Sequence, residues 1–369
     1  MKKPGLLLIM FFLWPVCTLA DTFQLVKIAS GLGVPWGMTF ISDDKMLFTE
    51  RQGNLGILNV NSGLLEYIEG LPEIHVAGQG GLMDVATSPE YDSEGWLYFT
   101  YVKPMNNYGE TTLARARLID LHLTDWQDLL VTRSIEGDNK HFGSRIAFDG
   151  EFVYFSVGER GYRPNAQDLS THAGSIIRLN LDGSTPEDNP FVNNNQALDE
   201  IWSYGHRNPQ GLAVHPETGN VWLNEHGPQG GDELNLVQPG LNYGWPVIGY
   251  GVNYGSGTAI HAGTRGEGIE SPAHFWVPSI ATSGMMIYTG DRFPAWTGSF
   301  FVGGTAGQQL ARLTPSIDQP QRIEQEETLT YGIGRVRDVR QGPDGYIYLA
   351  IDDRRGGPTA VVRLEPVPH

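Results

Sequence analysis

Apolar residues in this chain occur in short runs of four to eight positions, separated by Gly, Pro, Asp and Asn. Many runs alternate apolar and polar residues, as in a strand with one buried face, and several are rich in β-branched and aromatic residues. No stretch shows the long 3.6-residue periodicity of an amphipathic helix. The pattern therefore predicts an all-β protein.

One unit recurs along the chain: an apolar strand, a turn with Asp, Pro or Gly, and a second strand rich in aromatic and aliphatic residues. Its second strands align on Phe48, Tyr98, Tyr154, Trp222, Phe301 and Tyr348. The spacing is close to the ~40–50-residue repeat of propeller blades, with longer steps between the third and fifth units. Six repeats predict a six-bladed β-propeller with four-stranded antiparallel blades, forming a single domain over residues 21–369.

A third strand follows each pair, in Leu55–Leu58, Thr112–Arg115, Ser175–Leu179, Glu233–Leu236, Gln309–Arg312 and Ala360–Arg363. We expect a strand at Thr22–Ile28 to close the ring against the last blade, which removes exposed sheet edges. The longer steps contain two insertions, Asn165–Ala197 and Val247–Ile280. Such loops are expected to shape a pocket.

The first twenty residues have the features of a secretory signal peptide. Lys2 and Lys3 precede a short apolar run, and Thr18-Leu-Ala20 precedes the polar Asp21. The run is shorter than the ~20 residues of a membrane span. We predict cleavage after Ala20, which removes Cys17, the only cysteine. A periplasmic or secreted protein without a membrane span follows.

The net charge of −17 limits the partners of the chain. Removal of Lys2 and Lys3 makes the mature chain more acidic still. Nucleic acid and anionic lipid are poor partners for such a protein, whereas a neutral substrate and a bound cation suit it.

Potential ligand-binding groups cluster between Trp202 and Pro246. Carbonyls at Gly227-Pro228, the carboxylates of Asp232 and Glu233 and the amide oxygen of Asn235 are the hard ligands that Ca²⁺ prefers. Arg207 and Asn208 suit an anionic or carbonyl-rich partner. Tight turns alone explain the Gly and Pro residues here, but not the clustered charge.

Three motifs carry a resemblance to a known family: Tyr204–Gly211 (YGHRNPQG), Glu225–Pro228 (EHGP) and Asn242–Pro246 (NYGWP). They resemble the soluble PQQ-dependent aldose sugar dehydrogenase and glucose (sorbosone) dehydrogenase family, and the likeness extends from about Pro35 to Arg363. The resemblance implies a six-bladed propeller that uses pyrroloquinoline quinone (PQQ) and Ca²⁺. It also implies oxidation of the C1 hydroxyl of aldose sugars to aldonolactones, with electrons passing to an unidentified acceptor.

The family likeness also suggests roles for individual residues. It implies that His141 is the general base, since histidine titrates near neutrality. It implies that Gln79, Arg207, Asn208, Arg335 and Arg337 bind the cofactor, with Gln79 contacting PQQ or sugar. Ca²⁺ would be held by the carbonyls of Gly227 and Pro228, and a second Ca²⁺ by the Glu233 carboxylate and the Tyr243 carbonyl.

The chain departs from the family pattern at two places. Many relatives have a lysine where this sequence has Gly307 or Gln308, and the glucose dehydrogenase branch has an acid where this chain has Lys140, next to His141. A lysine at 140 is expected to lower the pKa of the histidine. Both departures favour the broader aldose branch.

Two other functions fit parts of the pattern. One is a Ca²⁺-dependent propeller lactonase or esterase, which needs several carboxylates and amides converging on one central ion. The other is a non-catalytic glycan- or partner-binding propeller, because a fold does not fix a function. The chain lacks the nucleophile-elbow, zincin, P-loop and dinucleotide-binding motifs.

Overall fold

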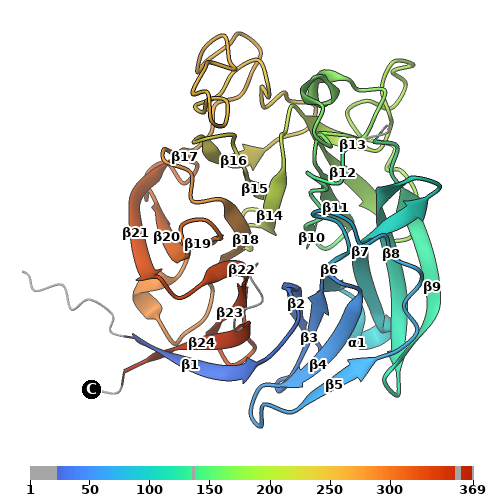
Figure 1. Cartoon of the computed structure of the whole chain (residues 1–369), viewed down its shortest axis with the longest axis vertical. Helices are drawn as coiled ribbons and strands as arrows, with labels where there is room; N and C mark the ends of the chain where they lie inside the picture. Colours follow the sequence, from blue (N-terminus) through green and yellow to red (C-terminus); the bar gives the residue numbers. More distant parts are fainter. Residues whose placement is uncertain (1–22, 135–137, 354–358, 368–369) are drawn as a thin grey trace, which may run out of the picture.

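The computed structural model describes residues 23–134, 138–353 and 359–367. The predicted signal peptide, residues 1–20, lies outside this part of the chain. Within it, 24 strands form six four-stranded antiparallel sheets arranged in a ring (Figure 1). The prediction of a six-bladed β-propeller is confirmed.

Each blade uses consecutive strands from the centre outward, except for the sixth. Blade one contains β2 (Pro35–Phe40), β3 (Lys45–Glu50), β4 (Asn54–Asn59) and β5 (Leu65–Ile68). Blade two contains β6 (Leu82–Thr87), β7 (Trp96–Met105), β8 (Tyr108–Ile119) and β9 (His122–Val131). Blade three contains β10 (Ile146–Phe148), β11 (Phe152–Val157), β12 (Ser175–Asn180) and β13 (Ile201–Tyr204).

Blade four contains β14 (Pro209–Val214), β15 (Val221–Glu225), β16 (Asp232–Val237) and β17 (His274–Trp276). Blade five contains β18 (Thr282–Ile287), β19 (Phe300–Gly304), β20 (Gln309–Pro315) and β21 (Ile323–Tyr331). Blade six contains β22 (Arg335–Gln341), β23 (Ile347–Asp352), β24 (Ala360–Pro366) and the first strand of the chain, β1 (Phe23–Ser30). The short helices are α1 (Tyr91–Glu94), η1 (Arg163–Gln167) and η2 (Pro294–Trp296).

The ring closes where β1 pairs antiparallel with β24, from Phe23 opposite Pro366 to Ser30 opposite Ala360. Figure 1 shows this pair as a blue strand beside a red one. The predicted closing strand, Thr22–Ile28, is confirmed with a shift of its bounds. Because the outer strand of blade six comes from the start of the chain, the two ends of the described chain hold each other in place.

The core lies between adjacent blades. Leu47 and Leu55 of blade one pack with Val85 and Phe99 of blade two in one cluster of buried side chains. Burying such side chains stabilises the fold by about 1.5–3 kcal/mol each. Gly56 lies opposite Phe48, and a Cβ at this glycine would come within 2.2 Å of the Phe48 ring. A glycine is therefore required where the aromatic ring crosses the neighbouring strand.

The innermost strands carry bulges that turn polar side chains toward the centre. Register shifts occur in β2, β6, β14, β18 and β22. A bulge re-aims the residues next to it. Two of these residues, Asp84 in β6 and Asp338 in β22, are fully buried and bind the buried Arg145 at 2.9 and 3.1 Å.

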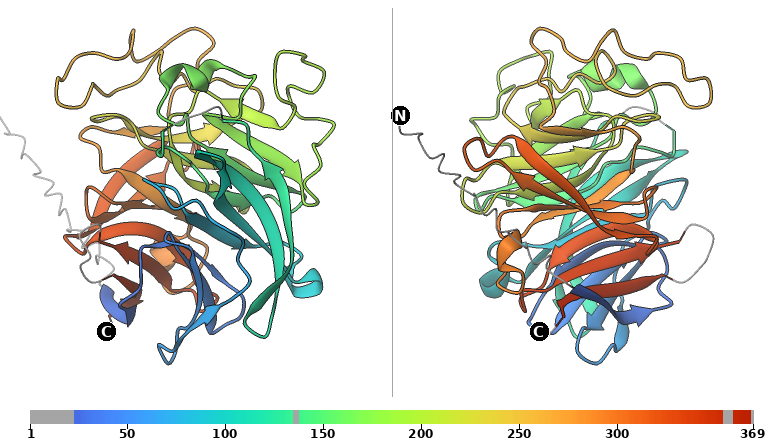
Figure 2. Two further views of the ribbon diagram at one scale, coloured as in Figure 1. Left: turned by 45° about the vertical axis from the view of Figure 1, so that its right-hand side comes forward. Right: turned by 90° about the vertical axis from the view of Figure 1, so that its left-hand side faces the viewer.

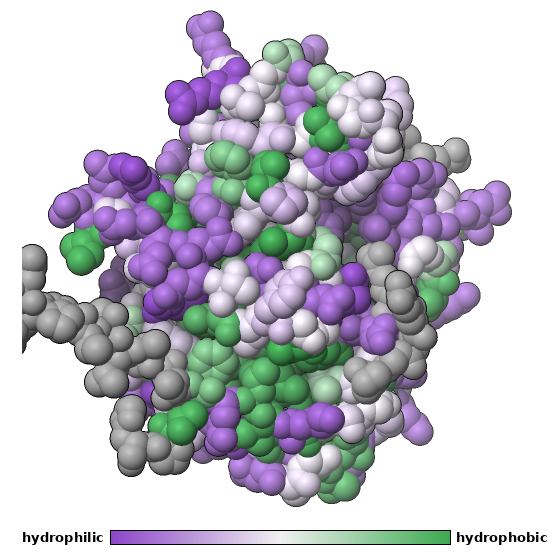
Figure 3. All heavy atoms as spheres, turned by 60° about the vertical axis from the view of Figure 1, so that its left-hand side comes forward, coloured by the Kyte–Doolittle hydropathy of each residue, from purple (hydrophilic) through white to green (hydrophobic). Residues whose placement is uncertain are grey.

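The insertion between β16 and β17 projects beyond the blades, at the top of Figure 2. Figure 3 shows one side of the molecule, on which hydrophilic residues dominate the upper half and a hydrophobic area occupies part of the lower half. In the part of the chain that the structure describes, no helix has the length and apolar character needed to cross a bilayer.

Candidate functional site

His141 lies just before β10, in a backbone conformation that few side chains adopt. Its φ is +54°, and it is 8% exposed. The backbone N–H of His141 donates to Oε1 of Gln79 at 2.8 Å, so blade two fixes the position of the loop. Strained residues held in this way cluster at functional sites.

A carboxylate orients the His141 ring. Nδ1 of His141 is hydrogen-bonded to Oε1 of Glu159, which follows β11. A Cβ on Gly158 would lie 2.2 Å from the His141 carbonyl oxygen, so only a glycine lets the two segments approach this closely. Because a carboxylate accepts, Nδ1 carries the proton and Nε2 is the basic atom.

The surroundings of His141 favour its neutral form. Burial lowers the pKa of His141, the hydrogen bond that His141 donates to Glu159 opposes this shift, and Arg207 and Lys140 add smaller lowering effects. The expected effect of Lys140 has the right sign but is minor, because its ammonium group binds Asp138 at 2.7 Å. Glu159, rather than an acid next to His141 in the sequence, orients the His141 ring.

Sequence reasoning did not single out Glu159, although a repeated signal was present. A glutamate stands at the end of the second strand, or two residues after it, in three blades: Glu50, Glu159 and Glu225. Each accepts hydrogen bonds from the segment that precedes the first strand of its own blade, as Glu50 does from the N–H of Gly33. The carboxylate is thus part of the repeating unit.

Three predicted cofactor residues line one small central cavity of about 30 Å³. They are Gln79 from the second blade, Asn208 from the fourth and Arg337 from the sixth. Oδ1 of Asn208 accepts from the N–H of Gly143 at 3.3 Å, next to His141. The cavity therefore joins residues that are far apart in the sequence.

Arg207 lies on a second cavity, of about 20 Å³, and is held at both ends. Its backbone N–H donates to Oε2 of Glu225 at 2.6 Å, and Nη1 donates to the carbonyl of His226 at 3.2 Å. Its Nε is buried without a hydrogen-bond partner among the described residues. A buried donor of this kind is available to an acceptor on a ligand or on an ordered water.

His226 lines both small cavities and connects them. Burial and the nearby Arg207 and Arg337 lower the pKa of His226 to about 3, so the ring is neutral. Nε2 of His226 lies 2.6 Å from the carbonyl oxygen of Thr282, to which it donates. Nδ1 is therefore an acceptor.

Arg335 and Arg337 meet at a carboxylate, but it is Asp352 rather than the neighbouring Asp338. Arg335 Nε and Arg337 Nη2 lie 3.5 and 2.8 Å from Oδ2 of Asp352. Asp338 instead binds Arg145 and Arg340. A bulge between Val336 and Asp338 separates the two groups of contacts.

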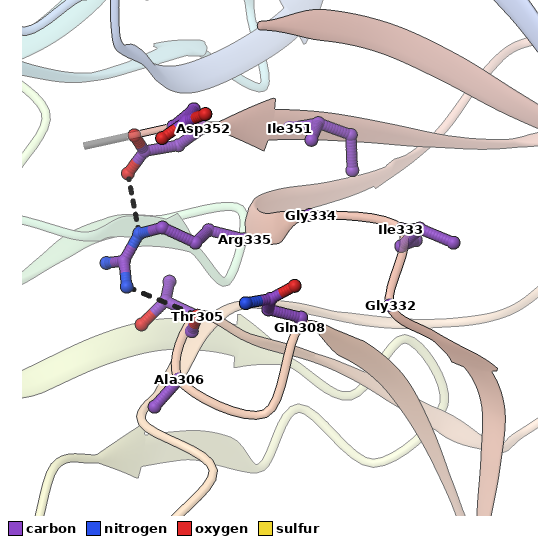
Figure 4. Close-up of a pocket in the computed structure, with 10 residues that line it drawn as sticks. Thr305, Ala306, Gln308, Gly332, Ile333, Gly334, Arg335, Ile351 and Asp352 are labelled. Atoms are coloured by element: carbon purple, nitrogen blue, oxygen red, sulfur yellow. Dashed lines mark hydrogen bonds and ion pairs between the residues drawn. The ribbon is translucent and has the colours of Figure 1, made fainter. Parts of the chain in front are cut away.

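Arg335 lines the largest of the three cavities, about 550 Å³ between blades five and six (Figure 4). Nη1 of Arg335 donates to the carbonyl of Thr305 at 3.2 Å. Gln308, one of the two residues at which the sequence departs from the expected family lysine, lines this cavity. The amide keeps hydrogen-bonding ability there without the positive charge.

The four predicted metal-binding residues share one cavity. Gly227, Pro228, Glu233 and Tyr243 all line the 20 Å³ space beside Arg207. Burial raises the pKa of Glu233 to about 8, and repulsion from Glu225 and Asp232 adds to this effect. Oδ1 of Asn235 is buried without a hydrogen-bond partner in the described chain. A buried carboxylate and an unpaired amide oxygen are ligands of the kind that a hard cation such as Ca²⁺ prefers.

The described residues contain no cluster of three or more His, Cys, Asp or Glu side chains arranged to hold a metal. Any cation here would therefore depend on backbone carbonyls as well. The carbonyl of Pro228 accepts from the hydroxyl of Tyr254 at 3.0 Å. That hydroxyl competes with a cation for one of the predicted ligands.

Of the two insertions, only the second shapes these cavities. Ile248, Gly249, Tyr250 and His261 from Val247–Ile280 line the space beside Glu233. The first insertion, Asn165–Ala197, contributes no lining residue to the three cavities. The expectation that both shape the pocket is thus only half met.

Comparisons with known proteins identify the family of this chain. A sequence profile of the glucose/sorbosone dehydrogenase family matches residues 32–362. The aldose sugar dehydrogenase YliI of Escherichia coli is 38% identical over 362 residues, which cover 94% of this chain and 96% of that protein. Quinoprotein glucose dehydrogenase B of Acinetobacter calcoaceticus is 29% identical, over 77% of this chain and 64% of its own length.

Solved structures show the same likeness. The apo form of the soluble aldose sugar dehydrogenase of Escherichia coli superposes with a TM-score of 0.87 at 34% identity, covering 94% of this chain and all of that chain. The PQQ-bound aldose sugar dehydrogenase of Streptomyces coelicolor has a TM-score of 0.77 at 25% identity, covering 94% of this chain and 99% of its own.

Proposed function

Because the chain belongs to the glucose/sorbosone dehydrogenase family, we propose that it oxidises the C1 hydroxyl of aldose sugars to aldonolactones, using PQQ and Ca²⁺. The observation that carries this proposal is the arrangement around His141. A neutral, oriented histidine stands beside a cavity lined by Gln79, Asn208 and Arg337. Arg207 borders the adjoining cavity, which His226 also lines.

The arginines suit the proposed cofactor, which bears three carboxylates. Arg207 and Arg337 each have a buried Nε without a hydrogen-bond partner among the described residues. Guanidinium groups bind carboxylates through strong, charge-assisted hydrogen bonds. Arg335 adds a third cation beside the 550 Å³ cavity, which has room for part of a ligand. Gln79 and Asn208 supply amides.

His141 would take the proton of the C1 hydroxyl at Nε2, because Glu159 occupies Nδ1. Burial keeps the ring neutral and therefore able to accept that proton at neutral pH. PQQ would supply the hydride acceptor that no amino-acid side chain provides. The 8% exposure of His141 leaves little room for water beside the base.

Calcium would be held by the carbonyls of Gly227 and Pro228, and a second ion by the Glu233 carboxylate and the Tyr243 carbonyl. A Cβ on Gly227 would lie 2.2 Å from the Gly231 carbonyl oxygen, so this turn tolerates no side chain. We further propose export to the periplasm or secretion, supported by the basic and apolar N-terminus. The electron acceptor is then a partner in that compartment.

The test uses the mature protein purified without cofactor, with an artificial dye as electron acceptor. Glucose, galactose, xylose and maltose are offered with PQQ and Ca²⁺ together, with each alone, and with neither. The proposal expects sugar-dependent dye reduction that requires both additions and is lost in His141→Ala. Failure to bind PQQ would overturn the dehydrogenase proposal and favour the lactonase or binding propeller.

A further inference from the structure

Blade four contains a second histidine–glutamate pair that the proposed reaction does not use. His206 precedes β14 as His141 precedes β10, and Glu225 ends β15 at a place comparable to that of Glu159 after β11. Nδ1 of His206 lies 3.0 Å from Oε1 of Glu225. The pair therefore repeats the contact between His141 and Glu159.

The two pairs differ in what surrounds them. Ser203 and His206 are both 0% exposed, and Oγ of Ser203 lies 2.9 Å from Nε2 of His206. The His206 ring is stacked on Tyr243, with centroids 4.7 Å apart and an angle of 20° between planes. Both ring nitrogens and one ring face are thus engaged by the protein.

The direction of the two hydrogen bonds of His206 follows from the Glu225 carboxylate, which can only accept. Glu225 accepts, so Nδ1 of His206 carries the proton, and Nε2 accepts from the hydroxyl of Ser203. A serine, a histidine and an acid in this order resemble a hydrolytic triad. Neither Ser203 nor His206 lines any of the three cavities described above, so a substrate has no route to this serine.

The other oxygen of Glu225 holds the backbone of Arg207. The N–H of Arg207 donates to Oε2 at 2.6 Å, while Nδ2 of Asn235 lies 3.3 Å from Oε1. If His206 did not bind Oε1, the carboxylate could rotate about its last bond, and the contact to Arg207 would loosen. Arg207 would then lose its backbone anchor and keep only the contacts of its guanidinium, which bonds the His226 carbonyl and lies 5.2 Å from the Trp245 ring.

We propose that His206 is a positioning residue, which fixes the Glu225 carboxylate and through it the place of Arg207 in the ligand cavity. The inference about Arg207 as a cofactor residue rests on the proposed function. The chain of hydrogen bonds from Ser203 through His206 and Glu225 to Arg207 does not rest on that function, and it can be tested without PQQ. His206 acts on ligand binding, whereas His141 acts on the proton.

Two substitutions of His206 distinguish the roles of its two ring nitrogens. The amide of His206→Asn reaches the place of Nδ1 and can still donate to Glu225, whereas the amide of His206→Gln reaches the place of Nε2. In protein labelled with ¹⁵N-arginine, the Arg207 amide should exchange with solvent about tenfold faster or more in H206Q, because a hydrogen bond to a charged group is weakened. H206N should stay within roughly threefold of wild type.

Equal exchange at Arg207 in wild type and H206Q, or equal acceleration in both variants, would overturn the proposal. Should H206Q fail to fold, the unchanged protein labelled with ¹⁵N-histidine still decides. His206 must show a proton on Nδ1 and none on Nε2, and the opposite tautomer contradicts the scheme.

Titration of the protein with PQQ then tests whether Arg207 binds the cofactor. H206Q should raise the Kd for PQQ about tenfold or more, with H206N close to wild type. Faster Arg207 exchange with an unchanged Kd would mean that Arg207 does not hold PQQ. Wild-type protein that fails to bind PQQ contradicts the proposed function, while the exchange data still decide the role of His206.

Discussion

Nδ1 of His141 is hydrogen-bonded to Oε1 of Glu159, a residue 18 positions further along the chain. The backbone N–H and carbonyl of Glu159 are also hydrogen-bonded. The N–H of Glu159 donates to the Arg207 carbonyl at 2.9 Å, and its carbonyl accepts from Nδ2 of Asn165 at 3.1 Å. Glu159 therefore connects the proposed base to the blade that carries Arg207.

Replacing Glu159 by Gln should slow the reaction and shift its pH dependence. The carboxylate raises the pKa of His141 against the lowering effect of burial, so its loss lowers that pKa further. A base must be neutral, so the acid limb of kcat/KM should move to lower pH, while kcat falls on the order of 100-fold because the ring loses its orientation. Asp125→Asn, which breaks an exposed pair with Arg117 elsewhere in the protein, is the matched control. A rate equal to wild type with an unmoved acid limb would show that Glu159 does not act on the base.

Glu233 should make the stability of the metal-free protein depend on pH. Its pKa is raised from 4.5 to about 8, so the folded protein binds the proton more tightly than the unfolded chain. This contribution is fully present below the ordinary pKa and is lost as the pH rises through about 8. Urea unfolding at pH 5 and pH 8, with and without Ca²⁺, measures the effect.

Calcium should restore stability at pH 8 in the wild type, and Glu233→Gln should remove both the pH slope and most of the calcium response. Asp291→Asn removes an exposed carboxylate elsewhere and should keep both. A calcium response that survives in E233Q would place the ion away from this carboxylate.

Asp338→Asn should be strongly destabilising. Its carboxylate binds Arg145 and Arg340 and accepts from the N–H of Met38 at 2.9 Å, and all of it is buried. Breaking such a buried network leaves uncompensated charge and costs about 3–5 kcal/mol in the free energy of unfolding. Asp125→Asn breaks an exposed pair with Arg117 and should cost less than about 1 kcal/mol. Similar losses in both variants would refute the importance of the central network.

Gln308→Lys should tighten PQQ binding. The added ammonium group would stand at the edge of the cavity that contains Arg335 (Figure 4). We expect the Kd for PQQ to fall roughly tenfold at low salt, and the gain to shrink at high salt as the charges are screened. Gln308→Met, which keeps the length without the charge, separates the electrostatic effect from packing. An unchanged Kd would mean that no carboxylate of PQQ comes near residue 308.

The blades could be predicted from the sequence because each one is encoded locally. Phe48, Tyr98 and Tyr154 mark second strands that pair with their own neighbours in the chain. The ion-pair partners of buried polar side chains could not be predicted in this way, because they depend on the three-dimensional packing of the strands. The pairing of Arg335 and Arg337 with Asp352, rather than with Asp338, arises from a bulge in β22 that no local pattern announces.

Contacts between loops could not be predicted from the sequence either. Glu159 reaches His141 because Gly158 permits a close approach of two backbones, and a lone glycine is compatible with many other turns. Both insertions were expected to shape the pocket, yet of the two only Val247–Ile280 lines one of the three cavities described above. Contacts that no local pattern indicates hold it there, such as the hydrogen bond from the Tyr254 hydroxyl to the Pro228 carbonyl.

The most direct test of the central claim is a single-turnover measurement on protein loaded with PQQ and Ca²⁺. The absorbance of bound PQQ is followed after mixing with glucose or with glucose deuterated at C1, without any electron acceptor. We expect a rapid change in absorbance whose rate is lower with deuterium and falls on the order of 100-fold in His141→Ala, while PQQ stays bound. A change that is equally fast in the variant, or that ignores deuterium at C1 in both proteins, would contradict proton transfer to His141 coupled to oxidation at C1.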